Sequence, residues 1–240
     1  MSKAGCTTWQ KILRTRFKDK RRQRNRRVPS YDKNFADSKH FRFINIRHPF
    51  DRLLSAYFNT VRKRHGEARG PGWRQLNYLS KYFNVSHHNI TLTQFLSFIA
   101  SPSNRHPRDV YFDRHWDSYA RSCKVCSIDF NYILRTETSS FDSEDVLERV
   151  GYPRHYLQVF KPLNKNPERS INQTAPQVSD TLEPPQFKKI LAPFSSIDRT
   201  LLKKVYDRFR LDFEAFGYHF DFEENVAHCS IKINDTHACC

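Results

Sequence analysis

The segment 41–57 restricts the possible fold more than any other part of this sequence. Residues 41–46 (FRFINI) are mostly apolar and predict a buried strand. Arg47 follows this strand, and Pro49 suits the first position of a helix because its ring fixes φ. Apolar residues then recur at helical spacing as far as about residue 64. A strand that turns at once into a helix is typical of α/β domains.

Other segments predict a chain that alternates helices with polar loops. We expect further helices over residues 7–17, 91–99, 143–150 and 197–213, a strand over 127–134, and a Pro-rich loop over 161–185. The length of 240 residues is enough for one domain with a substantial core. We predict a single domain over 1–223 and a Cys-containing tail over 224–240.

The sequence is strongly basic, which indicates a polyanionic partner. Its 41 Lys and Arg residues exceed its 25 Asp and Glu residues, so the formal charge is +16. Nucleic acid, an anionic membrane and an acidic polysaccharide all fit this charge. The basic run 18–27 is either a nucleic-acid-binding arm or a rim that faces a sulfated or carboxylated glycan. The glycan agrees better with the other motifs.

Glycosylation motifs and cysteines favour the secretory pathway. Four sequons stand at Asn84, Asn89, Asn172 and Asn234. The motif Cys123-x-x-Cys126 could be half of a zinc site, but no second well-spaced Cys/His pair accompanies it. We therefore expect this pair and the cysteines near the carboxyl terminus to form disulfides, with their connectivity left open.

A short loop before the first predicted helix has the features of an anion-binding site. Gly5 allows close approach of the backbone, Thr7 and Thr8 supply hydroxyl and N–H donors, and Lys3 supplies charge. The loop lacks the spacing of a Walker motif. The alternative is an ordinary helix N-cap with a lysine nearby.

Arg47 and Ser55 could form a second anion site. Ligands collect at the ends of parallel strands, where Arg47 is expected, and Ser55 lies on the helix that follows. A guanidinium fork with a hydroxyl suits a dianionic phosphate. The alternative is a structural ion pair between Arg47 and Asp51.

Four blocks of sequence, in order over residues 2–218, carry a resemblance to a known family. Residues 2–9 (SKAGCTTW) resemble the 5′-phosphosulfate loop of Golgi carbohydrate sulfotransferases, and residues 47–57 (RHPFDRLLSAY) resemble their 3′-phosphate motif. The chondroitin and dermatan 4-O-sulfotransferase branch is similar in two further blocks. One contains His115-Trp116, the Cys-x-x-Cys motif and Glu137-Thr138, and the other is residues 211–218 (LDFEAFGY).

This resemblance implies a P-loop-like sulfotransferase fold, with a central parallel sheet flanked by helices. The implied co-substrate is 3′-phosphoadenosine 5′-phosphosulfate, with no metal, and the acceptor is an anionic glycan such as chondroitin or dermatan, not nucleic acid. The implied location is the Golgi lumen, as a type II membrane protein. No apolar run approaches the roughly 18 residues that span a bilayer, and Met1 directly precedes the loop. We therefore expect an amino-terminally truncated chain that lacks the preceding strand and the anchor.

The resemblance also assigns roles to individual residues. The 5′ end of the donor would lie on Ser2, Lys3, Ala4, Gly5, Cys6, Thr7 and Thr8, and its 3′-phosphate on Arg47 and Ser55. Ser2 stands where the family usually has proline. Lys3 would stabilise charge on the leaving phosphate.

The acceptor hydroxyl also requires a base. His115 is the first candidate because imidazole accepts protons near neutral pH. Glu137 is the second candidate, with shaping of the site as its alternative role, and His48 is expected to cap the helix. Two other classes stay open: an inactive relative, and a basic heparin- or nucleic-acid-binding protein. The second explains the charge but not the ordered motifs.

Overall fold

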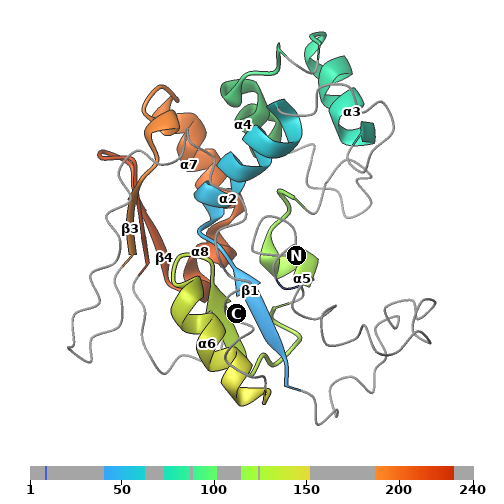
Figure 1. The fold of residues 1–240 in the computed structure, drawn as a ribbon. Coiled ribbons are helices and arrows are strands. Elements are labelled where there is room, and N and C mark those ends of the chain that lie inside the picture. Colours follow the sequence, from blue (N-terminus) through green and yellow to red (C-terminus); the bar gives the residue numbers. More distant parts are fainter. Residues whose placement is uncertain are drawn as a thin grey trace.

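A computed structural model describes Trp9 and residues 41–62, 73–86, 89–101, 115–123, 125–151 and 187–229. Within these ranges, five short strands form two sheets (Figure 1). Strands β1 (Phe43–Ile46) and β2 (Tyr132–Arg135) pair in parallel. Strands β3 (Phe187–Ile190), β4 (Tyr218–Asp221) and β5 (Val226–Cys229) form an antiparallel sheet with β5 in the middle. Strand β5 lies in the segment predicted as a tail.

The predicted strand–helix corner is confirmed. Strand β1 ends at Ile46, and helix α2 (Pro49–Ala56) begins two residues after Arg47 with Pro49 in its first turn. A π-helical segment, Tyr57–Arg62, continues α2. The second predicted strand starts later than expected, at Tyr132, because Asn131 turns the chain by bonding to both main-chain polar groups of Arg42.

The remaining helices confirm the predictions in part. They are α3 (Trp73–Phe83), α4 (Leu92–Ala100), α5 (Tyr119–Cys123), α6 (Ser139–Arg149), the 3-10 turn Ala192–Phe194, α7 (Arg199–Arg208) and α8 (Arg210–Phe216). Thr91 caps α4 through a capping box with Gln94. The helix predicted over 197–213 is two helices, since Phe209 leaves helical geometry between α7 and α8.

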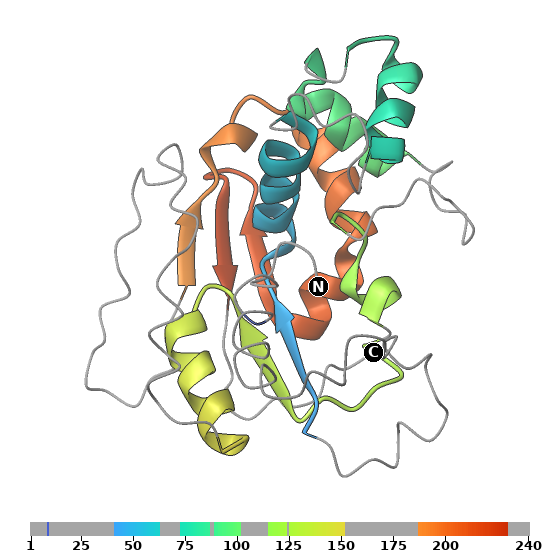
Figure 2. The same ribbon diagram turned by 45° about the vertical axis from the view of Figure 1, so that its right-hand side comes forward.

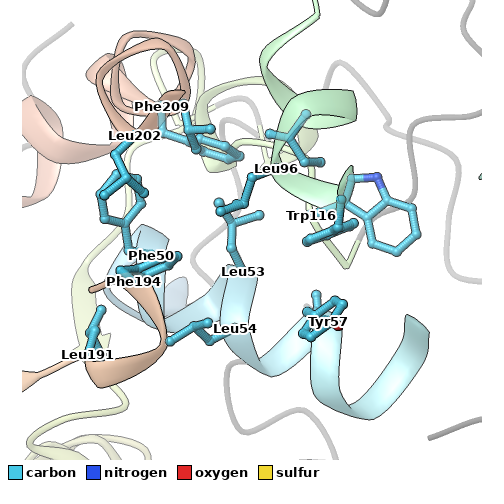
Figure 3. Close-up of a cluster of buried hydrophobic side chains, with 14 of the residues drawn as sticks. Phe50, Leu53, Leu54, Tyr57, Leu96, Trp116, Leu191, Phe194, Leu202 and Phe209 are labelled. Atoms are coloured by element: carbon cyan, nitrogen blue, oxygen red, sulfur yellow. The ribbon is translucent and has the colours of Figure 1, made fainter. Parts of the chain in front are cut away.

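The apolar face of α2 forms the centre of the main core (Figure 3). Phe50, Leu53 and Leu54 on α2, and Tyr57 at the start of the π-helical segment, point toward side chains of other elements. Those partners are Leu96 on α4, Leu202 on α7, Phe209 after it, and Leu191 and Phe194 around the 3-10 turn, all at most 2% exposed. Burial of this face sets the direction in which α2 leaves the end of β1.

A second, smaller cluster covers the parallel strands. It contains Trp9, Leu134, Val146 and Leu147, and α6 lies beside β2 in Figure 2. The ring of Trp9 lies 4.7 Å from that of Phe43 on β1. Residue 9 is therefore packed onto β1, immediately after the predicted anion-binding loop.

The two sheets lie next to each other (Figures 1 and 2). At the carboxyl end of the parallel pair, the guanidinium of Arg135 donates to the carbonyl of Phe216, the last residue of α8, and β4 begins two residues later. The described residues thus show mixed helices and strands with a two-stranded parallel sheet, which is the part of the predicted α/β fold that they contain. No helix in the described ranges is long and apolar enough to cross a bilayer.

Two leucines test this core. Leu202→Ala should lower the free energy of unfolding by about 2–5 kcal/mol, because it leaves a cavity between α2 and α7. Leu211 on α8 is 50% exposed, and Leu211→Ala should change the free energy of unfolding by about 0.5 kcal/mol or less. Urea denaturation measures both. Equal losses in the two variants would contradict this assignment of the core.

Candidate functional site

The candidate site lies at the carboxyl end of the parallel strands. Thr136 continues the pairing beyond β2, since its N–H and its hydroxyl both donate to the carbonyl of Ile46, at 2.9 and 2.8 Å. Arg47 follows one strand and Glu137 follows the other, so the register of the two strands brings these residues together. Ligands of parallel sheets are usually bound at this edge.

Asp51 holds two cations from different parts of the chain. Its Oδ2 accepts from Nε of Arg47 at 2.6 Å, and its Oδ1 accepts from Nζ of Lys189 on β3 at 2.9 Å. Burial by itself lowers the pKa of Arg47, but Asp51 and then Glu137 raise it above the ordinary value. The ion pair considered as an alternative is therefore present, and it orients the guanidinium at the end of β1.

Glu137 lies between two fixed donors. Its Oε1 accepts from the main-chain N–H of His48 at 2.6 Å, and its Oε2 accepts from the hydroxyl of Tyr218 at 3.1 Å. Tyr218 is in place because Gly217 ends α8 in a left-handed conformation, with φ of 64°. Burial raises the pKa of Glu137, more than the bond from His48 lowers it. These contacts suit a residue that shapes the corner.

His48 is fully buried at this corner. It occupies the N-cap position of α2, but its side chain makes no capping hydrogen bond, so the expected capping role is wrong. Its Nε2 lies 2.9 Å from the carbonyl of His219 instead, which links α2 to β4. Burial lowers the pKa of His48 to about 4, so the ring is neutral at pH 7 and donates from Nε2.

Ser55 lies on the same helix as Asp51, one turn further on, and is 4% exposed. Asn59 donates from Nδ2 to the carbonyl of Ser55 at 3.0 Å and reaches its hydroxyl at 3.4 Å. Helix α2 thus carries both the carboxylate that holds Arg47 and the hydroxyl of the predicted second anion site.

His115 is partly exposed in a turn before α5. The neighbouring Trp116 is fully buried and meets the ring of Phe95 edge-on, with centroids 5.5 Å apart. The buried Trp116 therefore fixes the position of the main chain beside His115, while the His115 side chain stays partly exposed.

Several predicted site residues lie outside the described part of the chain. They are Ser2, Lys3, Ala4, Gly5, Cys6, Thr7, Thr8, Asn172 and Asn234, together with the basic run 18–27. The two described sequon residues, Asn84 and Asn89, are both exposed. Among the residues that the structure describes, no group of three or more His, Cys, Asp or Glu side chains is arranged to hold a metal.

The expectation that these cysteines form disulfides is confirmed for Cys126 and wrong for Cys123 and Cys229. Cys126 is disulfide-bonded, but Cys123 carries a thiol, so the two cysteines of the motif do not pair with each other. Cys229 also carries a thiol, and burial raises its pKa to about 11. It is buried as the last residue of β5.

Comparison with known proteins identifies the family. The profile described as "Sulfotransferase family" matches residues 1–219, which include the whole corner from Arg47 to Ser55 and all of the sequence blocks above. The chain belongs to the sulfotransferase family. No solved structure matches it significantly.

Several curated relatives of this sulfotransferase chain are carbohydrate sulfotransferases. It is 26% identical over 184 residues to carbohydrate sulfotransferase 14 of Danio rerio, covering 75% of this chain and 44% of that protein. It is 23% identical over 189 residues to carbohydrate sulfotransferase 10 of Xenopus laevis (75% and 48%), and 22% over 191 residues to carbohydrate sulfotransferase 11 of Mus musculus (77% and 49%). The chain spans about half the length of these relatives.

Sequence reasoning missed Lys189 and the contact of Tyr218 with Glu137. Lys189 is 138 residues from Asp51, and it follows a Pro-rich stretch of sequence with no motif that marks it. Tyr218 was included in a matched block without a role. Only its position after the turn at Gly217 shows that its hydroxyl reaches the sulfotransferase corner.

The neutral state of His48 can be tested by its effect on stability. Because its folded pKa is about 4 and the ordinary value is 6.5, the unfolded state binds more protons between these pH values. His48 therefore stabilises the fold less as pH falls from 6.5 to 4, by up to about 3 kcal/mol in total. In His48→Gln, this part of the pH dependence should vanish.

The measurement is urea denaturation of both proteins between pH 4 and 7. The difference between the two curves isolates His48, since other groups such as the buried Asp212 titrate in both. Parallel curves over this range would show that burial does not lower the pKa of His48 in the fold.

Proposed function

We propose that this chain is a carbohydrate O-sulfotransferase. It transfers a sulfonate group from 3′-phosphoadenosine 5′-phosphosulfate to a hydroxyl of a glycan. Membership of the sulfotransferase family and the names of the curated relatives support this activity. The strongest support comes from the corner at the end of β1. There the motif of residues 47–57 lies at the carboxyl edge of the parallel strands, where ligands usually bind.

The corner supplies charge suited to one end of the donor. Arg47 and Lys189 share the single carboxylate of Asp51, so these three groups together carry one net positive charge. Both cations keep some exposure, 13% and 17% of their side chains. Arg47, with the Ser55 hydroxyl further along α2, would hold the 3′-phosphate and so orient the donor.

The other end of the donor is assigned to the loop Ser2–Thr8. Trp9 is packed onto Phe43, so the chain is tied to β1 directly after this loop. Lys3 and the loop N–H groups would stabilise negative charge that develops on the 5′-phosphate. Gly5 has no side chain, so the backbone there would approach the phosphate closely.

The transfer is an in-line displacement at sulfur. The acceptor hydroxyl oxygen forms a new S–O bond while the S–O bond to the 5′-phosphate breaks. The electron pair of the broken bond stays on the phosphate. The hydroxyl proton passes to His115, whose ring is partly exposed, or to Glu137 in the second assignment. No step requires a metal.

We further propose a chondroitin- or dermatan-like acceptor and a location in the Golgi lumen. The matching relatives are named carbohydrate sulfotransferases, which supports a glycan acceptor, and the sequence resembles the chondroitin and dermatan 4-O-sulfotransferase branch in two blocks. The charge of +16 suits a polyanionic glycan. The disulfide at Cys126 and the exposed Asn84 and Asn89 agree with an oxidising, glycosylating compartment.

Donor binding tests this function directly. Arg47→Ala and Lys3→Ala should each weaken binding of 3′-phosphoadenosine 5′-phosphate about 10- to 100-fold, because each removes a charge-assisted contact. Calorimetry or retention on an immobilised nucleotide measures this. Arg149→Ala is the matched control, since Arg149 also pairs with an aspartate four residues away, on the exposed side of α6. Binding no tighter than that of ATP would favour a general polyanion-binding protein.

The base is tested by turnover. His115→Ala should keep donor affinity and lower kcat for sulfate incorporation by about 10²- to 10⁴-fold, because it removes the proton acceptor. The acceptor panel contains chondroitin, dermatan, heparan and N-glycan. His219→Ala is the control, since that ring is exposed and only its carbonyl contacts His48. Loss of donor binding in His115→Ala would make His115 a structural residue.

A further inference from the structure

Two buried charged residues hold the segment that follows His115. The first is Arg52 on α2, which is 2% exposed. Its Nη1 donates to the carbonyl of Asp117 at 2.5 Å, and its guanidinium carbon lies 4.3 Å from the centre of the Tyr119 ring. One side chain of α2 therefore fixes both ends of the segment 117–119.

The second charged residue is Asp212 on α8, which is completely buried. Its Oδ2 accepts from the N–H of Tyr119 at 2.8 Å, and its Oδ1 accepts from the N–H of Ala120 at 3.0 Å. Asp212 thus caps the first turn of α5 from another element. Burial raises its pKa to about 6, although both N–H groups and the charge of Arg52 lower it.

Burial of these two charged side chains costs free energy, and their contacts show that both bind the main chain after His115. A buried ion is expensive to desolvate, and apolar side chains of similar size often stabilise a core equally well or better. Here Arg52 donates to a main-chain carbonyl and Asp212 accepts from two main-chain N–H groups, all within residues 117–120. Together with the buried Trp116, they determine the path of the chain directly after His115.

Through Arg52, the turn that carries His115 is connected to α2, the helix of the predicted donor site. Arg52 stands one residue after Asp51, which holds Arg47, and one helical turn before Ser55. Resting on the proposed function, we propose that Arg52 and Asp212 are positioning residues. They hold the turn with His115 at a set place relative to α2, so that the acceptor hydroxyl, the base and the bound donor align.

Two conservative variants test this positioning. Asp212→Asn keeps an acceptor for one N–H of α5 and places an amide NH2 opposite the other. Arg52→Lys keeps the positive charge and loses the planar group above Tyr119. Asp198→Asn is the matched control, because Asp198 is also a helix-capping carboxylate but caps α7.

The first readout is the imidazole NMR spectrum, which requires no activity. In Asp212→Asn and Arg52→Lys, the ring resonances of His115 should move, and those of the buried His48 should keep their wild-type positions. In Asp198→Asn neither should move. Unchanged His115 resonances in both test variants would overturn the proposal. Loss of the His48 signals in both would also overturn it, since these residues would then support the whole core.

The second readout separates binding from turnover. Both test variants should keep the affinity for 3′-phosphoadenosine 5′-phosphate within about twofold and lower kcat by roughly 10- to 100-fold, because small displacements of reacting groups have large effects on rate. Equal losses of donor affinity and kcat would contradict a positioning role. If the wild-type chain neither binds the nucleotide nor transfers sulfate, the proposed function fails, and the histidine spectra still decide the positioning of the turn.

Discussion

The parallel pairing of β1 with β2 is the interaction on which the rest of the corner depends. It joins segments that are almost ninety residues apart in the sequence and ends with two bonds from Thr136 to Ile46. Because the strands are parallel and in this register, the residues that follow them meet at one edge. Arg47 and Glu137 are neighbours for that reason, and α2 starts between them.

The carboxylates at this edge are buried, and each of them accepts hydrogen bonds from two donors. Burial of an unpaired polar group costs free energy, and burial of a charge costs more. The carboxylate of Glu137 accepts from His48 and Tyr218, and Asp51 accepts from Arg47 and Lys189. The bonds of Asp51 link α2 to Lys189 on β3, and those of Glu137 link the segment after β2 to Tyr218 on β4, so the contacts that satisfy the buried carboxylates also connect the two sheets. A corner held from four elements suits the orientation of an anionic donor.

Local pattern predicted the elements but not their exact limits or their partners. The corner at Arg47, helix α4 and helix α7 follow from apolar spacing and from Pro49, which act within a few residues. The break at Phe209 was missed, since the helical spacing continues across it. The position of His48 before Pro49 predicts a capping side chain, but the ring makes no capping bond and donates to the carbonyl of His219 on β4.

The sequence by itself determined the family, the strand–helix corner and the identity of the residues at it. Those properties are carried by short ordered motifs and by local backbone preferences, which need no knowledge of the fold. Only the tertiary structure decided that Lys189 shares Asp51 with Arg47 and that His48 is neutral. It also decided that Arg52 and Asp212 form hydrogen bonds with the segment after His115. These contacts join elements up to 138 residues apart, and they depend on how strands pair and which charges become buried.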